Sequence, residues 1–440
     1  MRMTESKSIG KYMSLLFFSM SHIIKEVKAR QILDSRGNPT VEAEVATEKA
    51  VARAAAPSGA SKGKEEAVEL RDGGREFHGK GVLRAVENIE KIIAPAIKGM
   101  DVRQQEEIDR KIIEIDATKN KSLLGANACI AVSMACCKCA SASLEMETYE
   151  YIGRGARVLP VPFMNVINGG VHAGNDLEIQ EHMIVPLRAK NFSQAMQMGC
   201  EVYHTLKENL KKRYGKNAIN VGDEGGFAPP LKETEEALEI ILEAIEENGY
   251  GNEVMLALDC AASSFYKNGK YMLAGEMNAG ELLDYYVQLA KTFPIVSIED
   301  AFSEDDWEAF AEITKKMGNK IQIVGDDIFV TNPKRLRKGI KKGVCNALLL
   351  KPNQIGTVSE ATEVAQICEE NGYGIMVSHR SGETCDDFIA DFSVALECGQ
   401  IKAGAPARGE RVAKYNRLLR IEEMIEKPIY GGRKWSKWGF

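Results

Sequence analysis

The second half of the chain alternates short apolar runs with amphipathic helical patterns, and this rhythm limits the fold more than any other feature. Apolar runs of strand length occur at 254–258, 295–298, 321–324, 347–350, 374–377 and, less clearly, 399–401. Helical spacing of apolar residues separates them, as at 235–247, 281–291, 307–317 and 359–370. Repeated strand–helix units of this kind are typical of a sheet of parallel strands.

Each apolar run is followed within two residues by a side chain that can carry chemistry. In chain order these are Asp259, Glu299, Asp326, Lys351, His379 and Lys402. The carboxyl ends of the strands in a β/α barrel meet at one mouth, so a barrel would gather all six around a single pocket. An open, doubly wound sheet is the alternative, but it would not bring six strand ends to one point, and the chain has no glycine-rich dinucleotide fingerprint. The pattern favours the barrel.

The first third of the chain is organised differently. Strand-like stretches in 23–47 flank a turn at 35–39, a glycine-rich loop covers 57–63, and helical spacing continues to about residue 150. A chain of 440 residues also exceeds one ordinary core. We therefore predict an α/β protein with a disordered extension at 1–20, a smaller N-terminal α+β capping domain at 21–152 and a C-terminal β/α barrel at 153–440.

Composition and charge exclude several classes of protein. Apolar residues make up 44% and charged residues 27%, the balance of a globular protein, and a net charge of −6 without a basic stripe argues against nucleic acid as a partner. The apolar run at 13–20 is too short to span a membrane and no cleavage site follows it. The 10 cysteines show no zinc spacing, and those at 136–139 are typical of a buried helix. We expect a cytoplasmic protein without a membrane span.

The acids at three successive strand ends predict a metal site. Asp259, Glu299 and Asp326 would repel one another at close range unless a cation neutralised them. Oxygen ligands without cysteine or histidine favour Mg²⁺ over Zn²⁺. The alternative is that each is an ordinary solvated or ion-paired acid, the usual fate of a single carboxylate.

Lys351 follows the next strand and is a candidate base. Burial and a nearby cation would both lower its pKa, and bringing that pKa from ~10.4 to ~7 requires about 4 kcal/mol, which buried lysines can show. The alternative role is a structural ion pair.

Two further segments carry candidate groups for acid chemistry and anion binding. Glu224 lies between glycines in VGDEGGFAP, 221–229, where a tight turn would fix its carboxyl as a general acid; an acidic turn residue is the alternative. In SHRSGET, 378–384, Arg380 and Ser381 could bind phosphate oxygens, and Lys402 could bind a carboxylate. The alternative for Arg380 is a surface salt bridge. His172 and Glu181 fall in GGVHAGNDLEIQEH, which we expect to be a mobile loop over the pocket.

Ten segments together resemble the enolase family. They are SRGNPT, PSGAS, NGGVHAGN, VGDEGGFAP, LDCAAS, SIED, VGDD, KPNQIGT, SHRSGET and GQIKAGAPARGER, in family order over residues 21–435. The resemblance implies a β/α barrel of enolase type and the reversible dehydration of 2-phosphoglycerate to phosphoenolpyruvate in glycolysis and gluconeogenesis. It also implies a homodimer, with a higher oligomer left open.

The resemblance also implies a role for each matching residue. Asp259, Glu299 and Asp326 would bind a first Mg²⁺, and Ser61 would help bind a second with the substrate phosphate. Lys351 would remove the C2 proton, and Glu224 would protonate the departing C3 hydroxyl, assisted by Glu181. The remaining expected substrate contacts are His172, Gln180, His379, Arg380, Ser381 and Lys402.

Six positions depart from the common family pattern, and none removes an expected ligand. They are Lys62, His182, Ser264, Ala301, Cys385 and Ala403. Two other functions stay open at this point: a related lyase or racemase acting on another carboxylate, and a non-catalytic binding relative. The intact acid, base and phosphate sets favour the dehydratase.

Overall fold

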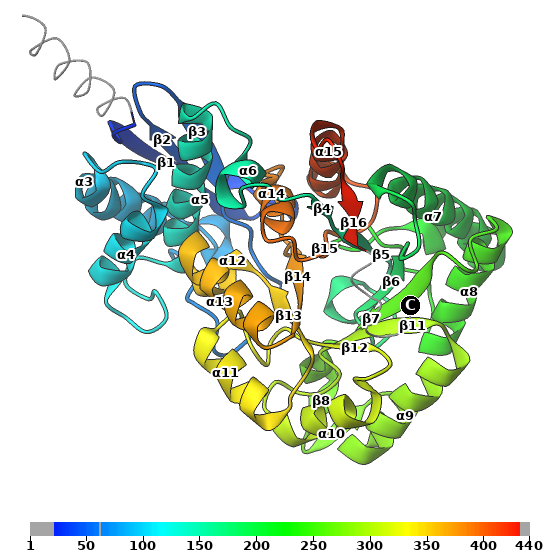
Figure 1. The fold of residues 1–440 in the computed structure, drawn as a ribbon. Coiled ribbons are helices and arrows are strands. Elements are labelled where there is room, and N and C mark those ends of the chain that lie inside the picture. Colours follow the sequence, from blue (N-terminus) through cyan, green and yellow to red (C-terminus); the bar gives the residue numbers. More distant parts are fainter. Residues whose placement is uncertain (1–21, 61–62, 432–440) are drawn as a thin grey trace, which may run out of the picture.

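The computed structural model describes residues 22–60 and 63–431. The predicted extension at 1–20, and the predictions for Ser61 and Lys62, lie outside the described residues. A small N-terminal part packs beside a closed eight-stranded barrel (Figure 1). The predicted combination of an α+β part and a β/α barrel is confirmed.

The N-terminal part begins with an antiparallel sheet in the order β1 (Glu26–Leu33), β2 (Pro39–Ala46) and β3 (Val51–Ala55). In the turn between β1 and β2, the carboxylate of Asp34 accepts hydrogen bonds from the backbone of Arg36 and Asn38, both at 2.9 Å. The expected strand–turn–strand is therefore confirmed, while β3 was not predicted. The helices that follow are η1 (Glu76–Gly79), α2 (Leu83–Asn88), η2 (Ile89–Ile93), α3 (Ala94–Ile97), α4 (Gln105–Asp116), α5 (Ala126–Ser143) and α6 (Thr148–Ile152).

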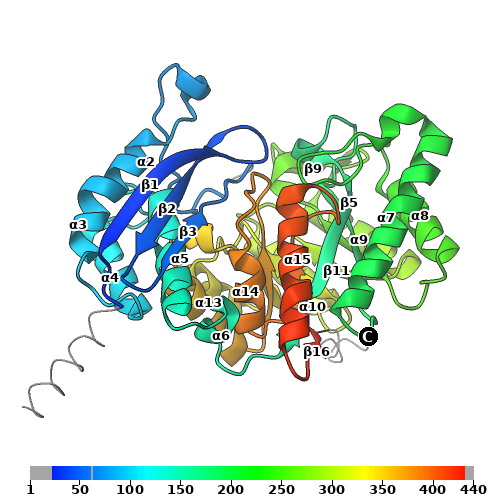
Figure 2. The same ribbon diagram turned by 90° about the horizontal axis from the view of Figure 1, so that it is seen from above.

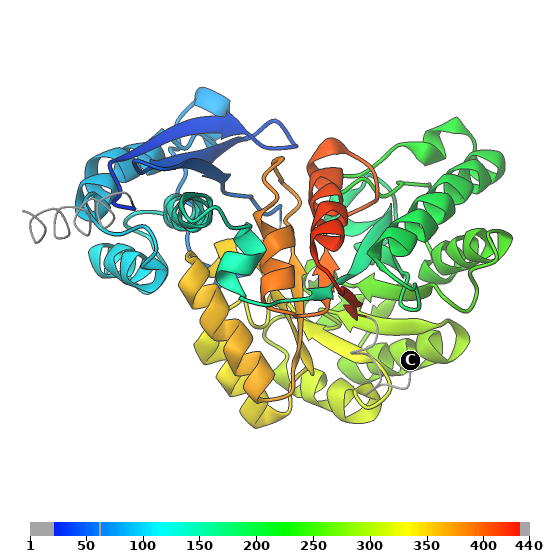
Figure 3. The same cartoon turned by 45° about the horizontal axis from the view of Figure 1, so that its top comes forward.

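Helix α5 is the centre of the N-terminal part. Its alanines and cysteines are almost all buried, because it packs on β2 and β3 on one side and on α12 and α13 of the barrel on the other (Figures 2 and 3). Within the described residues it is the one helix long and apolar enough to cross a membrane, but 89% of it is buried inside the fold. It is the core helix that joins the two parts, and the cysteines at 136–139 are buried in it, as predicted.

The barrel closes in the order β11, β12, β13, β14, β15, β5, β6, β7. These strands are β5 (Val161–Asn168), β6 (Glu181–Val185), β7 (Met255–Asp259), β11 (Ile295–Glu299), β12 (Gln322–Gly325), β13 (Ala347–Leu350), β14 (Gly374–Ser378) and β15 (Gln400–Lys402). All six predicted apolar runs are barrel strands. Short strands lie outside: β4 (Val158–Leu159) pairs with β16 (Ile429–Tyr430), and β8 (Tyr266–Lys267), β9 (Lys270–Met272) and β10 (Glu276–Met277) form a small sheet.

Helices surround the barrel, and several begin at residues that cap them. Asn278 and Glu281 form a reciprocal capping box at the start of α9, and Asn332 with Pro333 starts α11. The helices are α7 (Phe192–Tyr214), α8 (Thr234–Glu247), α9 (Ala279–Thr292), α10 (Trp307–Met317), α11 (Pro333–Lys342), α12 (Pro352–Ile355), α13 (Val358–Glu370), α14 (Phe388–Ala395) and α15 (Gly409–Met424), with short 3₁₀ turns η3 (Gly170–His172), η4 (Lys216–Ile219) and η5 (Ala262–Phe265).

One strand runs against the others, and this corrects a sequence prediction. The segment 169–182 was expected to be a loop throughout, but Glu181 and His182 begin β6, which pairs antiparallel with both β5 and β7. Because β6 is reversed, its first residue lies at the same end of the barrel as the last residues of its parallel neighbours. Glu181 is therefore fixed in the barrel wall rather than carried on a mobile loop.

Candidate active site

Strand register places three carboxylates side by side at the barrel mouth. Glu181 of β6 is level with Asp259 of β7, which is level with Glu299 of β11. Lys402, the last residue of β15, lies two strands from β6 around the barrel, and its ammonium reaches all three carboxylates. Its Nζ lies 3.1 Å from Glu181 Oε1, 2.8 Å from Asp259 Oδ2 and 2.9 Å from Glu299 Oε1.

These buried groups perturb one another strongly. Burial lowers the pKa of Lys402, but Asp259, Glu181 and Glu299 together raise it well above its usual value. Burial and the charge of Asp259 raise the pKa of Glu299 well above its usual range. Burial also raises the pKa of Asp259, yet Lys402 and Lys351 together lower it more, so Asp259 is the one of these three carboxylates whose charged form is favoured.

Lys351 forms a second cationic point at the mouth. Its Nζ lies 2.5 Å from Asp326 Oδ2, and the other carboxylate oxygen of Asp326 accepts a hydrogen bond from Gln354 Nε2 at 3.0 Å. The pKa of Lys351 was expected to fall; here burial does lower it, but the carboxylates of Asp326 and Glu299 together raise it more, so the net pKa is raised. The expected lowering fails because the strongest neighbour of this ammonium is a carboxylate rather than a cation.

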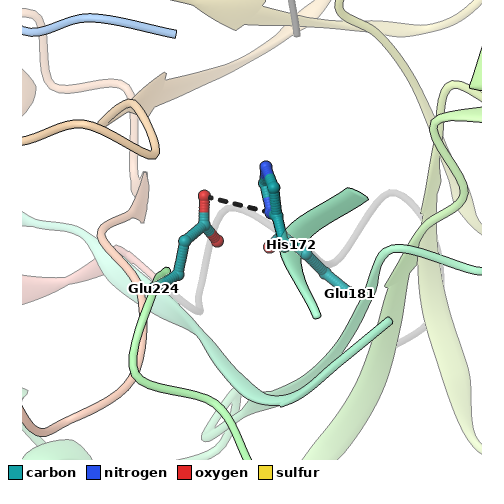
Figure 4. A group of neighbouring side chains, drawn as sticks. All are labelled: His172, Glu181 and Glu224. Atoms are coloured by element: carbon teal, nitrogen blue, oxygen red, sulfur yellow. Dashed lines mark ion pairs between the residues drawn. The ribbon is translucent and has the colours of Figure 1, made fainter. Parts of the chain in front are cut away.

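Glu224 lines the same pocket and lies close to two histidines, and Figure 4 shows its ion pair with the first of them, His172. Its Oε1 lies 3.6 Å from His172 Nδ1 and 3.6 Å from His379 Nε2, and its Oε2 accepts a hydrogen bond from Asn165 Nδ2 at 3.1 Å. Ligand atoms of His172, Glu181 and Glu224 all lie within 4.8 Å of one another. The acid expected on the glycine turn is thus directed at the pocket.

The pKa values of the two glutamates in this cluster are shifted in opposite directions. Burial and the charge of Glu224 raise the pKa of Glu181 well above its usual value. Burial acts the same way on Glu224, but His379, His172 and Arg411 lower its pKa well below the usual value. Environments that push the pKa values of two neighbouring carboxyl groups apart in this way are typical of acid–base sites. These directions favour Glu181 over Glu224 as the carboxyl that holds a proton.

The glycines around Glu224 are required by close packing. A Cβ on Gly222 would lie 2.4 Å from the carbonyl oxygen of His172, and Gly225 has a φ of +88°. The carbonyl oxygen of Glu224 accepts a hydrogen bond from the Ala405 backbone at 3.0 Å. The tight turn predicted from VGDEGGFAP is confirmed by this geometry.

The expected phosphate-binding groups line the same pocket. The guanidinium of Arg380 donates to both carboxylate oxygens of Glu66 at 3.1 Å and to Asn353 Oδ1 at 3.2 Å. Ser381 Oγ accepts a hydrogen bond from the backbone of Ala60 at 2.7 Å. The 57–63 loop therefore contacts Ser381 through Ala60. Arg380 does form the ion pair that was the alternative to phosphate binding, but the pair is buried rather than on the surface.

A small cavity of about 30 Å³ lies among these side chains. Gln180 lines it and directs Nε2 toward Asp259 Oδ2 at 3.4 Å. The predicted residues that line it are His172, Gln180, Glu181, Glu224, Asp259, Asp326, Lys351, His379, Arg380, Ser381 and Lys402. That volume holds one or two waters, so a three-carbon phosphate ester would require the side chains or the adjoining loop to move.

The donor set at the mouth fits a hard dication. Four acids, Glu181, Asp259, Glu299 and Asp326, face the ammonium groups of Lys351 and Lys402. Glu299 Oε2 and Glu181 Oε2 are buried and accept no hydrogen bond from the described residues. Surplus negative charge with oxygen donors alone suits Mg²⁺ better than Zn²⁺. Asp326 also lies within 4.8 Å of Asp300 and Asp327, ligand atom to ligand atom.

Several residues of the site escaped prediction. Arg411 contacts His379, Glu66 contacts Arg380 and Asn165 contacts Glu224. The only signal for Arg411 was its place in the family-like segment GQIKAGAPARGER, to which no role was assigned. Glu66 follows the PSGAS loop by five residues and carried no pattern of its own.

Fold and site together define a β/α-barrel enzyme with buried carboxylates, histidines, lysines and an arginine around one small pocket. The family model for the enolase C-terminal TIM barrel domain matches residues 156–438, and that for the enolase N-terminal domain matches residues 24–152. Enolase of Pyrococcus furiosus is 60% identical over 418 residues, covering 93% of this chain and 97% of the relative, and enolase of Methanocaldococcus jannaschii is 59% identical over 413 residues with the same coverage. This chain belongs to the enolase family.

Proposed function

We propose that this chain is a hydro-lyase that interconverts 2-phosphoglycerate and phosphoenolpyruvate in glycolysis and gluconeogenesis, with the barrel mouth as its catalytic machinery. Identity of 53–60% to curated enolases over most of the chain supports this activity. The observation that carries the mechanism is the meeting of Lys351, Lys402, Glu224 and the strand-end acids around one cavity. Each has the chemistry that a proton abstraction followed by loss of water requires.

Magnesium is the proposed cofactor, with two ions per active site. Asp259, Glu299 and Asp326, whose carboxylates contact Lys402 or Lys351 at the barrel mouth, would hold the first. Ser61, outside the described residues, would help hold the second together with the substrate phosphate. When bound, Mg²⁺ supplies positive charge that stabilises the substrate carboxylate as it gains electrons.

Lys351 is the proposed base for the C2 proton. Its ammonium must first lose a proton, and the ion pair with Asp326 opposes this. If Asp326 is a metal ligand, its carboxylate no longer stabilises the Lys351 ammonium alone, so the pKa of Lys351 falls toward the range of a base. The raised pKa found here thus reflects the pairing of Asp326 with Lys351, and does not conflict with the role.

Glu224 and Glu181 are the proposed acid pair for the C3 hydroxyl. The raised pKa of Glu181 and the lowered pKa of Glu224 favour a proton on Glu181, and Glu224 lies 3.6 Å from both His172 and His379. We propose that the pair supplies one proton to the departing hydroxyl. Glu224 contacts the hydroxyl and donates the proton, and Glu181 is the second carboxyl, from which Glu224 receives that proton. Gln180 and His172 would contact the substrate from the same side.

Arg380, Ser381 and Lys402 are the proposed anion ligands. Arg380 and Ser381 would hold the phosphate, since a guanidinium and a hydroxyl together match phosphate oxygens. Lys402 would pair with the substrate carboxylate as charge develops on it. His379 would contact the substrate beside Arg380.

Turnover of 2-phosphoglycerate, followed by the ultraviolet absorbance of phosphoenolpyruvate, tests the proposal. We expect product only when Mg²⁺ is present, loss of product in Lys351→Met, and normal product in Lys338→Met, which changes an exposed lysine of α11. Glycerate without phosphate should not react. Turnover of an unphosphorylated acid in preference to 2-phosphoglycerate would show a related lyase or racemase instead, and no metal-dependent turnover would contradict the proposal.

We further propose a homodimer located in the cytoplasm, with the domain boundary between residues 152 and 153. All ten cysteines are free, which suits a reducing compartment. Light scattering of the purified protein tests the dimer, and a monomer mass would contradict it. Cell fractionation tests the location, and recovery with the membrane or secreted fraction would contradict it.

A further inference from the structure

Helix α15 carries a fully buried arginine, Arg411, directly behind the pocket. Its Nη1 lies 2.6 Å from His379 Nδ1 and donates to the carbonyl oxygen of Arg380 at 2.6 Å. Its Nη2 donates to the carbonyl oxygens of Ser381 at 2.6 Å and Asp223 at 3.0 Å. One guanidinium thus ties the turn that carries Glu224 to the segment that carries the phosphate ligands.

Arg411 packs closely against the backbone of Gly404. Gly404 has a φ of +82°, and a Cβ there would lie 2.9 Å from Arg411 Cδ and 3.1 Å from His379 Cε1. The hydroxyl of Tyr415, four residues along α15, donates to the carbonyl oxygen of Gly404 at 2.6 Å. The glycine that lets the guanidinium approach the imidazole is therefore itself held in place.

This contact decides where the proton of His379 resides. A guanidinium has only donors, so the imidazole Nδ1 beside it must be the acceptor and the ring proton must be on Nε2. Nε2 is the nitrogen that faces Glu224 Oε1 at 3.6 Å. The other charged groups around the ring are Lys402 and Lys414. A proton on Nδ1 would point at a fixed cation.

We propose that Arg411 is a positioning residue that holds His379 as the neutral Nε2–H tautomer, so that His379 directs an N–H toward Glu224, 3.6 Å away, and does not accept a proton. The inference about the tautomer stands on the contacts of Arg411 alone. Its consequence for turnover rests on the proposed function, in which Glu224 meets the departing hydroxyl.

Nitrogen NMR of protein labelled with ¹⁵N-histidine tests the tautomer without reference to turnover. We expect the His379 ring, assigned by its loss in His379→Gln, to show a protonated Nε2 and an unprotonated Nδ1 across the neutral range. Arg411→Met should produce a mixture of tautomers or a ring that titrates. Arg411→Gln, which removes the positive charge and can accept as well as donate a hydrogen bond, serves if Arg411→Met does not fold. A single Nε2–H tautomer that persists in the Arg411 variants would overturn the proposal.

Kinetics test the consequence for catalysis. Arg411→Met should lower kcat by about 10²-fold with little change in KM, as expected when an acid–base group loses its orientation. The double variant Arg411→Met/His379→Gln should be no slower than the slower single variant, because both changes act on the same ring. Multiplying losses would contradict the proposal.

Arg417→Met is the matched control. Arg417 lies on the same helix, with ion pairs to Asp391 and Glu147 outside the pocket. We expect a lower melting temperature with unchanged NMR signals of His379 and unchanged kcat. If Arg417→Met changes the NMR signals of the His379 ring as much as Arg411→Met does, the change reflects a general loss of packing around α15 and the positioning role is refuted. If the protein has the expected NMR signals but no turnover, only the proposed function fails.

Discussion

Replacing His182, in the barrel wall, with phenylalanine should remove a loss of folding stability that occurs at acidic pH. His182 follows Glu181 on β6, so its ring points away from the mouth, and it is fully buried. Neither ring nitrogen makes a hydrogen bond with a described residue, although the nearby Ile167 backbone slightly favours the charged form. Burial is the dominant cause and lowers the pKa of His182 from 6.5 to about 4.

The size and sign of the effect follow from that shift. In the unfolded chain the imidazole binds a proton near pH 6.5, whereas the folded protein resists protonation until about pH 4. Stability is therefore unaffected above pH 7 and is lost as the pH falls from 6.5 toward 4. Between pH 8 and pH 5 the loss amounts to ~2 kcal/mol, and the full shift corresponds to ~3.4 kcal/mol. Phenylalanine cannot be protonated, so His182→Phe lacks this loss.

Differential scanning calorimetry of both proteins at pH 8 and pH 5 measures the effect. An unfolding entropy of roughly 0.9 kcal/mol/K for a chain of this length converts ~2 kcal/mol into about 2 °C. The advantage of His182→Phe over the unchanged protein should thus be about 2 °C larger at pH 5. Other titrating groups are common to both proteins and cancel. His204→Phe, at an exposed position of α7, should show no such dependence. An advantage that stays constant between the two pH values would refute the reasoning.

Three further outcomes are expected together. Chelation of divalent ions should abolish turnover and added Mg²⁺ should restore it, with Asp259→Asn requiring about tenfold more Mg²⁺ or higher; activity that survives chelation would contradict the metal site. Lys402→Met should destabilise the protein by about 3–5 kcal/mol in denaturant unfolding, because three buried carboxylates lose their shared partner; unchanged stability would contradict that pairing. Cys385 is the one fully exposed cysteine, so a thiol reagent should modify one site rapidly in the native protein and none in Cys385→Ser; rapid labelling of the buried α5 thiols would show that the helix opens.

Six of the seven parallel barrel strands could be predicted from sequence because each is an apolar run buried between the barrel interior and the helices. β5 was not predicted, although it too is buried and pairs parallel with β15. β6 could not be predicted, because it begins with Glu181 and His182 and so lacks an apolar start. Its reversed direction puts a polar first residue at the mouth, where the parallel strands put their last. A search for polar side chains directly after each apolar run therefore misses a functional residue that begins a strand.

The residues of the site also fall into those that the sequence could locate and those that it could not. Asp259, Glu299, Lys351 and Lys402 could be located because strand register alone brings their positions to one rim. Arg411 reaches the pocket from a helix that surrounds the barrel, through contacts that depend on the packing of α15 and on Gly404. The pKa of Lys351 went the other way from the sequence expectation because the balance between burial and Asp326 depends on a distance that no sequence pattern encodes.

The most direct test of the account follows the C2 hydrogen of the substrate rather than the product. With Mg²⁺ present, substrate deuterated at C2 should exchange its label with solvent and also yield phosphoenolpyruvate. Lys351→Met should lose both exchange and product, whereas Glu224→Gln should still exchange the label while making little product, because the base is intact and the acid is not. Exchange that survives in Lys351→Met, or that disappears in Glu224→Gln while Lys351 is unchanged, would contradict the assignment of base and acid to these two residues.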